Sequence, residues 1–346
     1  MERRDRGTLV FYAVLTLAIC AVLAWPGACL AQTYISFDAP GAGTGPDQGT
    51  FPTAITRNGF IGITVKDNNS FRHGFVRLAN GKFTKVQPPH SIDTSIAGIN
   101  WRGQVGGSFF DEVGGISHGY VKNANGTYVQ LDVPGATGGT NVSGINSTGQ
   151  VTGTSFGPSG GQAFFWDPAN PSEYVTFTVP GSAGTTAAAI NDGGEITGSY
   201  GDSAGTHGYV RTIDGTITTF DFGGTSRATS PVAINTKGQV AGSESDEGIG
   251  AGFLRTPLGH LIQFGSESHG GPQAEAISDT GVIVGFEFSE GGGNVAFVRD
   301  AAGNYTFLAV PFPNMATSAT GVNRSGQIVG TYTDDAGASH GWLLTP

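Results

Sequence analysis

The chain has 346 residues, of which 58 are glycine and only 13% are charged, and its formal net charge is -10. Each glycine inside a helix costs about 1 kcal/mol relative to alanine, so this composition disfavours helices. The acidic balance excludes nucleic acid as a partner, because phosphate backbones require clustered lysine and arginine. Aromatic residues at 10% argue against plain disorder. We therefore expect an all-β protein that is rich in turns.

The first 31 residues have the pattern of an export signal. Three arginines near the start precede an uninterrupted apolar run from Leu9 to Trp25, and small residues lie before a predicted cleavage site after Ala31. We predict a signal peptide over residues 1–31 and a secreted, extracellular or periplasmic protein with no remaining membrane span. The alternative is an uncleaved N-terminal membrane anchor. Both cysteines fall inside this segment, so the mature chain would have no disulfide.

A nine-residue pattern, I-N-x-x-G-x-h-x-G with h apolar, organises the rest of the chain. Its seven copies begin at Ile55, Ile99, Ile145, Ile190, Ile234, Ile277 and Val322. Successive copies are 44, 46, 45, 44, 43 and 45 residues apart. A period of this size is typical of solenoids and propellers.

Two further elements keep the same period. A small-aromatic-apolar triplet follows each copy, and in four repeats it is preceded by a histidine: His73, His118, His207 and His340. A segment related to F-D-x-P-G follows, clearest at Phe37–Gly41 and Leu131–Gly135. Each repeat then contains four short strands separated by turns, and four strands in about 45 residues is the size of a propeller blade.

Two details favour a closed ring over an open stack. The residue before each repeat isoleucine or valine is alanine or glycine, as expected where the innermost strands converge. The domain also starts with a fourth-strand segment, Tyr34–Pro40, and ends after a third-strand segment, Gly341–Leu344. We therefore predict one domain over residues 32–346, a seven-bladed β-propeller of four-stranded blades in which the N-terminal strand completes the last blade.

The I-N-x-x-G-x-h-x-G and His-Gly-aromatic repeats resemble the bacterial extracellular repeat family named for its His-Ala-Phe element. The resemblance covers residues 34–346, although three of the seven repeats lack the histidine. It implies an exported repeat protein and carries no assigned activity.

The repeated polar residues are expected to be structural. The four histidines occupy one equivalent place in separate blades, where we predict that each bonds a neighbouring loop and fixes the third strand. The repeated asparagines, as in Asn146, are expected to form tight turns. Outside the repeat pattern lie His90, His260 and His269, and no catalytic motif accompanies them.

Acidic residues recur in the loop between the second and third strands of six repeats. The predicted rim contains Asp67, Asp111, Glu112, Asp202, Asp246, Glu247, Glu290, Asp334 and Asp335, with Glu244 and Glu287 nearby. Such a rim would attract a cationic partner or a calcium ion, and no other cofactor is expected. The alternative is that these acids build solvated turns. The third repeat has Gly157–Gly160 in this place.

Export, near-uniform blades and missing catalytic motifs favour a non-catalytic binding or scaffold module for a glycan or protein ligand. The alternative is a propeller enzyme, a lyase or hydrolase, with a metal or a histidine such as His90 or His269 at the channel mouth. A purely structural surface repeat is a third hypothesis.

Overall fold

The computed structural model describes residues 14–15, 32–112, 115–222, 228–246, 249–269, 271–289, 292–312 and 316–346. These residues form strands and turns and contain no helix, so none of their segments is a helix long and apolar enough to cross a membrane. The predicted signal peptide lies outside the described residues, apart from the short strand β1 (Val14–Leu15), which pairs with β2 (Thr33–Phe37).

The remaining strands fall into four-stranded antiparallel sets, here called blades and numbered by repeat. Blade 1 contains β3 (Gly49–Ile55), β4 (Ile61–Lys66), β5 (Arg72–Arg77) and β6 (Phe83–Val86), and blade 2 contains β7 (Ser91–Ile99), β8 (Val105–Asp111), β9 (Ser117–Lys122) and β10 (Tyr128–Leu131). Blade 3 contains β11 (Gly139–Ile145), β12 (Val151–Gly157), β13 (Gly160–Trp166) and β14 (Tyr174–Phe177), and blade 4 contains β15 (Gly184–Ile190), β16 (Ile196–Gly201), β17 (Thr206–Arg211) and β18 (Ile217–Phe220). Blade 5 contains β19 (Ala228–Ile234), β20 (Val240–Asp246), β21 (Ile249–Arg255) and β22 (Leu261–His269), and blade 6 contains β23 (Pro272–Ile277), β24 (Ile283–Phe288), β25 (Asn294–Arg299) and β26 (Tyr305–Phe307).

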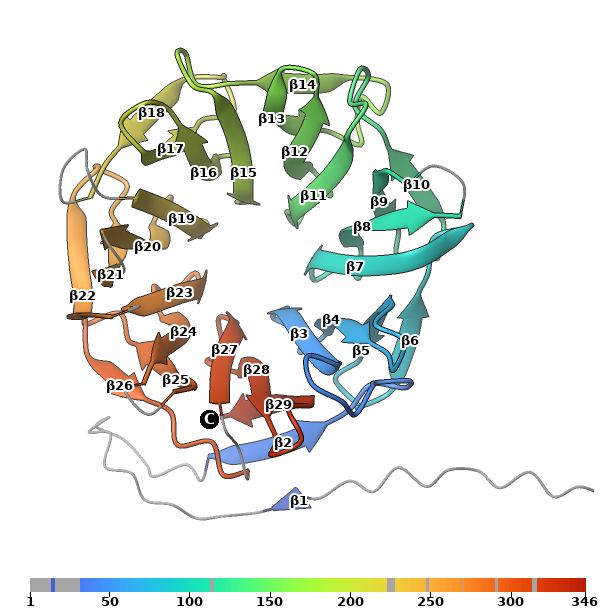
Figure 1. Ribbon diagram of the computed structural model, residues 1–346, viewed down its shortest axis with the longest axis vertical. Helices are drawn as coiled ribbons and strands as arrows, with labels where there is room; N and C mark the ends of the chain where they lie inside the picture. Colours follow the sequence, from blue (N-terminus) through green and yellow to red (C-terminus); the bar gives the residue numbers. More distant parts are fainter. Residues whose placement is uncertain are drawn as a thin grey trace, which may run out of the picture.

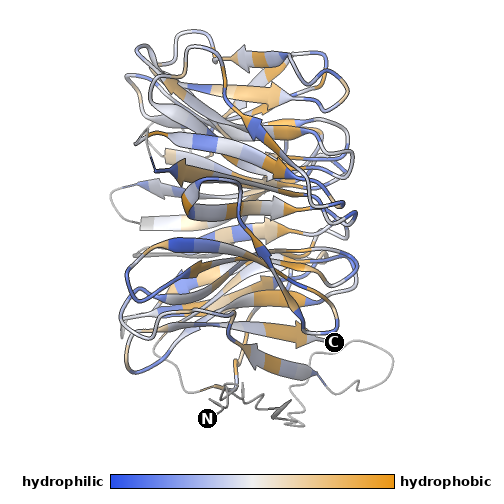
Figure 2. Ribbon diagram, turned by 90° about the vertical axis from the view of Figure 1, so that its right-hand side faces the viewer, coloured by the Kyte–Doolittle hydropathy of each residue, from blue (hydrophilic) through white to orange (hydrophobic). Residues whose placement is uncertain are grey.

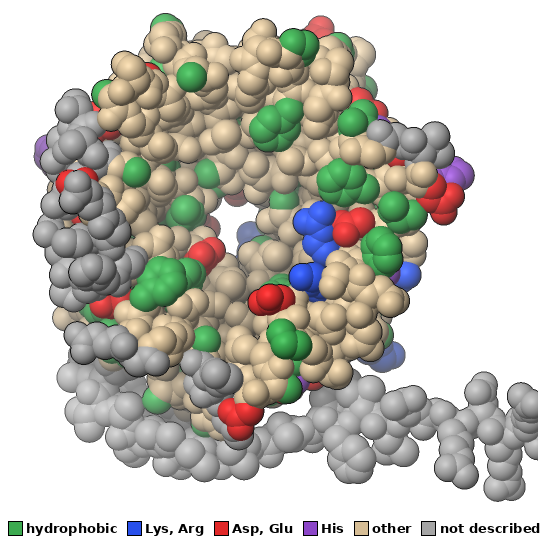
Figure 3. Space-filling model, in the orientation of Figure 1, with side chains coloured by type: hydrophobic (Ala, Val, Ile, Leu, Met, Phe, Trp, Pro, Cys, Tyr) green, Lys and Arg blue, Asp and Glu red, His purple; other side chains and the backbone are tan. Residues whose placement is uncertain are grey.

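The last blade combines the two ends of the domain. It contains β27 (Ala316–Val322), β28 (Ile328–Thr333) and β29 (Ser339–Thr345), and β2 pairs with β29 from Thr33↔Thr345 to Phe37↔Gly341. Figure 1 shows the blades arranged around a central opening, with the first strand of each blade innermost. Figure 3 shows that side chains leave this centre hollow.

The innermost strands approach one another closely, as the small residues before the repeat isoleucines predict. A Cβ atom added at Gly321 of blade 7 would lie 3.2 Å from the amide nitrogen of Ile55 in blade 1. Each innermost strand also contains a one-residue β-bulge at an equivalent place, for example between Val142 and Gly144 of blade 3. The bulges leave one extra residue per blade unpaired beside the central opening.

The last glycine of the repeat pattern gives the buried aromatic ring its space. A Cβ atom at Gly153 would lie 2.0 Å from the carbonyl oxygen of Asn141 and 2.7 Å from the ring of Phe164. Phe164 and its counterparts in the third strands are buried, and they belong to the hydrophobic core between blades. Figure 2 shows the blades from the side, with apolar residues along the strands.

The repeated asparagines form the expected turns and also join the blades. The Oδ1 atom of Asn146 accepts hydrogen bonds from the amides of Thr148 (3.1 Å) and Gln150 (3.0 Å) within its turn. Its Nδ2 atom donates to the carbonyl oxygen of Asn191, the equivalent residue of blade 4, at 3.0 Å. The same link joins blade 7 to blade 1, where Asn323 donates to Thr56 at 3.0 Å. The turn prediction is confirmed, and the link between blades is an additional role.

Candidate functional site

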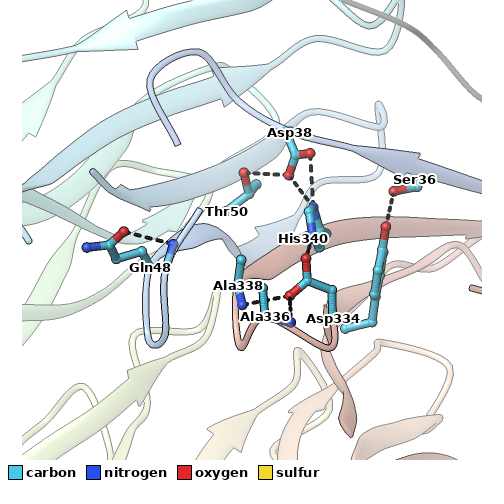
Figure 4. Close-up of polar contacts among 10 residues, drawn as sticks. Ser36, Asp38, Gln48, Thr50, Asp334, Ala336, Ala338 and His340 are labelled. Carbon is cyan, nitrogen blue, oxygen red and sulfur yellow. Dashed lines mark hydrogen bonds and ion pairs between the residues drawn. The ribbon is translucent and has the colours of Figure 1, made fainter. Parts of the chain in front are cut away.

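The four repeat histidines lie on one face of the molecule, here called the loop face, where each second strand ends and each third strand begins. In blade 7 the Nδ1 atom of His340 lies 3.0 Å from Asp38, and its Nε2 atom lies 3.3 Å from Asp334 (Figure 4). The ring also stacks on Tyr332 with centroids 4.8 Å apart. Asp38 follows β2 and Asp334 follows β28, so the imidazole ties the fourth strand to the loop.

The same arrangement, here called the histidine clamp, recurs in two other blades. In blade 4, Asp221 and Asp202 lie 2.6 and 3.0 Å from the ring nitrogens of His207, whose ring packs at a tilt against Tyr200 with centroids 4.9 Å apart. In blade 2, His118 lies 2.7 Å from Asp132 and 3.6 Å from Asp111, and its ring packs at a tilt against Phe109 with centroids 5.2 Å apart.

Blade 1 contains half of the clamp. His73 bonds the loop residue Asp67 at 2.9 Å, whereas Gln87 occupies the place of the fourth-strand aspartate. The predicted role of the histidines, fixing the third strand to a loop, is confirmed. The sequence-based interpretation missed the second carboxylate. A fourth-strand aspartate occurs only in the three repeats that also have the histidine and the preceding aromatic residue, and this covariation was the available signal.

The aspartates of the clamp favour the protonated form of the histidine, and the histidine favours the ionised form of the aspartates. The hydrogen bond that His207 donates to Asp221 raises the pKa of the imidazole, against the opposing effect of burial. The pKa of Asp202 is lowered, first by the backbone amide of Ala204 and then by His207. Carboxylates face both ring nitrogens, so the imidazole is engaged by the fold and is not presented to a substrate.

The structure distributes the acids of the predicted rim among three kinds of place. Clamp and turn bonds engage Asp67, Asp111, Asp202 and Asp334. The nearby Glu244 and Glu287 are buried, and Glu287 accepts a hydrogen bond from Tyr305 at 2.6 Å. Glu112, Asp335 and the clamp residue Asp202 are exposed to solvent, and the other described members of the rim are partly exposed. Glu247 and Glu290 lie outside the described residues. No three histidine, cysteine or acidic residues of the described chain are grouped so that they could hold a metal ion.

Of the three histidines outside the repeat pattern, one lies before blade 2 and two lie in blade 5. His90 occupies a turn before β7 with a positive φ of 62°. His260 lies in the turn between β21 and β22, where its amide bonds the hydroxyl of Thr256. His269 is the last residue of β22, and its side chain lies outside the described part of the chain.

Blade 3 has a pocket where other blades have the clamp. The pocket has a volume of about 180 Å³ and lies between the loop at Gly157–Gly160 and the connection Val133–Ala136. Ser155 and Gln162, a cross-strand pair, line its floor in place of an aromatic residue and a histidine. The departure of the third repeat from the common pattern therefore has a structural consequence.

An apolar patch occupies the loop face at the junction of blades 1 and 2. Phe71 and Ile92 are 46% and 43% exposed, and they flank the ion pair of Arg72 with Asp93, whose Nε and Oδ1 atoms are 2.7 Å apart. We call Phe71, Arg72, Ile92 and Asp93 the junction patch.

One charged residue departs from the sevenfold pattern beside the central opening. The bulge residues are Thr53, Ala97, Ser143, Ala188, Val232, Glu275 and Thr320. Glu275 is the only ionisable member. The residue keeps a solvent-accessible surface, but the protein packed around its carboxyl group reduces hydration and raises its pKa to about 7. An alignment of the seven repeats shows this exception, and the sequence-based interpretation missed it.

No protein-family model matches the chain, and no curated protein is similar to it at a significant level. Solved structures are similar in fold. The virginiamycin B lyase from Staphylococcus aureus has a TM-score of 0.60 and 13% identity, over 91% of this chain and 100% of that chain. The BP39L lectin from Burkholderia pseudomallei has a TM-score of 0.52 and 11% identity, over 82% of this chain and 92% of that chain.

A puromycin hydrolase is also similar, with a TM-score of 0.54 and 15% identity, over 82% of this chain and 50% of that chain. The three proteins are a lyase, a lectin and a hydrolase, so the likeness supports a β-propeller fold and does not choose between binding and catalysis.

Proposed function

We propose that the protein is an exported, closed seven-bladed propeller that binds a glycan or protein ligand through its loop face, without catalysing a reaction. Its resemblance to the extracellular His-Ala-Phe repeats and the pattern of residues 1–31 support export. The pairing of β2 with β29 supports closure of the ring.

The junction patch is the observation that carries the binding function. Phe71 and Ile92 are large apolar side chains, and each is nearly half exposed. Their contact with water is unfavourable, and a bound ligand would remove that contact. The adjoining ion pair of Arg72 with Asp93 supplies donors and acceptors at the edge of this apolar surface. Apolar contacts beside polar ones are the usual composition of a binding interface.

The patch is tested by Phe71→Ser and Ile92→Ser in the full-length protein, with Leu258→Ser as the matched control. Leu258 is 85% exposed in the turn between the third and fourth strands, at the opposite end of its blade. A glycan array and a panel of purified surface proteins serve as probes. We expect both junction variants, and not the control, to weaken binding about tenfold. Equal binding by all three variants would exclude the patch.

Glu275 supports a second candidate function, an enzyme with its site at the central opening. A carboxyl group with a pKa of about 7 is suited to general acid–base catalysis near neutral pH. This hypothesis predicts turnover in a screen of lyase and hydrolase substrates that is lost in Glu275→Gln. Turnover that survives this substitution would remove Glu275 from the mechanism.

A further inference from the structure

We propose that the pocket of blade 3 binds a neutral, polyhydroxylated ring, such as one sugar residue of a glycan, in the space that the histidine clamp occupies in blades 2, 4 and 7. This inference rests on the proposed binding function and names a ligand class and a second place on the loop face.

The pocket results from a coordinated change of side chains. In blade 4 the cross-strand pair that faces this space is Tyr200 with His207, whereas in blade 3 it is Ser155 with Gln162. The two clamp aspartates are also replaced in the third repeat, by Gly157 in the loop and Thr178 after the fourth strand.

Other repeats without a complete clamp refill the same space. Blades 5 and 6 place the buried side chains of Glu244 and Glu287 at the position of the aromatic residue, and blade 1 retains His73. Blade 3 alone combines two small or flexible uncharged side chains there. Its volume of about 180 Å³ is enough for a single ring.

The lining specifies an uncharged ligand with many hydroxyl groups. Ser159 and Gln162 provide a hydroxyl and a carboxamide group that both donate and accept hydrogen bonds. The Ser155 hydroxyl donates to the carbonyl oxygen of Gln162 at 3.3 Å, and its oxygen can still accept. No charged residue lines the pocket, so an ionised ligand would lose hydration without compensation. A fully apolar ligand would leave these polar groups without partners, which is also unfavourable.

Apolar side chains complete the recognition surface. Val133, Pro134 and Pro158 line the pocket beside the polar groups. A sugar ring presents hydroxyl groups at its edge and C–H groups on its faces, and it can therefore contact both kinds of surface. The glycines at 157 and 160 carry no side chain into the pocket, so the loop backbone lies close to any occupant.

The decisive variant rebuilds the clamp of blade 4 in blade 3. It combines Ser155→Tyr, Gly157→Asp, Gln162→His and Thr178→Asp in the full-length protein, and the new side chains should fill the pocket. The probes are the methyl glycosides of glucose, galactose, mannose and N-acetylglucosamine, with glucuronate as the charged comparison. Binding is measured by saturation-transfer NMR and calorimetry.

We expect at least one neutral glycoside to bind the wild-type protein in preference to glucuronate. Affinity should fall about tenfold or more in the rebuilt variant and in Gln162→Ala, as expected for lost hydrogen bonds between neutral groups. Circular dichroism would show whether the rebuilt variant folds. If it does not, Gln162→Ala alone tests the pocket.

The outcomes separate this inference from the proposed function. Glycoside binding that persists in both variants would place the sugar elsewhere and overturn the pocket assignment. No glycoside binding in the wild-type protein would also overturn it, while a ligand whose binding is lost in Phe71→Ser would leave the proposed function standing. Glycoside binding lost only in the blade 3 variants supports the pocket.

Discussion

The asparagine links between blades predict that one buried amide stabilises two blades. Asn146 is 3% exposed, and its side chain makes five hydrogen bonds. It accepts three within its turn, from the amides of Thr148 and Gln150 and from the Thr148 hydroxyl, and it donates one to Gln150 (2.8 Å) and one to Asn191 (3.0 Å). Each such bond contributes about 1 kcal/mol net. The Asn191 carbonyl oxygen also accepts a hydrogen bond from the amide of Gly194 at 3.1 Å, so it keeps one partner when the bond from Asn146 is removed. We expect Asn146→Ala to lower the free energy of unfolding by about 2–4 kcal/mol.

Two matched variants separate the turn from the link between blades. Ser278 occupies the equivalent place in blade 6, and its hydroxyl accepts the amide of Val282 at 3.1 Å. Asn146→Ser should therefore keep part of the turn and lose only the donated bonds, for about half of the cost. Asn125→Ala removes an asparagine from an exposed turn, where its Oδ1 atom accepts the amide of Thr127 at 3.0 Å, and should cost about 1 kcal/mol or less.

The assay is guanidinium unfolding followed by tryptophan fluorescence, with native-state hydrogen exchange at the amides of residues 148 and 150. The alanine variant should expose these amides and reduce the unfolding midpoint without changing the slope much. A cost for Asn146→Ala no greater than that for Asn125→Ala would refute the view that the link between blades stabilises the ring.

Three further predictions concern titration and packing. The pKa of His207 is raised in the folded state, so its protonation stabilises the fold fully at pH values below the unfolded pKa near 6.5, and this stabilisation is lost as the pH rises through the folded pKa. His207→Gln should therefore reduce the fall in melting temperature at alkaline pH. An unchanged dependence of the melting temperature on pH would contradict this prediction. The pKa of Glu275 is raised from 4.5 to about 7, so the folded protein loses stability as the pH rises between these values. Glu275→Gln should therefore gain more stability over the wild-type protein at pH 8 than at pH 4. A stability gain of equal size at both pH values would disprove the raised pKa. Gly153→Ala places a Cβ atom 2.0 Å from a backbone oxygen, whereas at Gly161 the nearest atom is 3.5 Å away, so the first substitution should cost about 1–3 kcal/mol or more in unfolding experiments and the second much less; similar costs would refute the packing argument.

Repetition made the fold predictable. The spacing of the I-N-x-x-G copies places four strands in each repeat, and the strands found in blades 1 to 6 follow that order. The offset of Tyr34–Pro40 from the repeats pointed to the partner strand of the last blade, and β2 does pair with β29. These predictions succeed because turns and alternating strands depend on local sequence. Seven copies of one pattern also show which residues are common to all repeats and which are exceptions in one repeat.

The candidate sites were less predictable because their residues come from different strands. Asp38 and His340 are 302 positions apart, and the pairing of β2 with β29 brings them to 3.0 Å. The predicted acidic rim counted loop carboxylates by their position in the repeat. It could not separate Asp334, which bonds His340, from Asp335, which is exposed to solvent.

The amino-acid sequence by itself determined the repeat, the turn at each asparagine and the close approach that requires small residues in the innermost strands, since each depends on contacts within one unit or on the same contact made seven times. Only the tertiary structure decided which side chains meet between strands and between blades. The clamp at His207, the pocket beside Gln162 and the surroundings of Glu275 each depend on such meetings. Burial, hydrogen bonding and the pKa of a group are properties of that three-dimensional environment, which a single repeat does not contain.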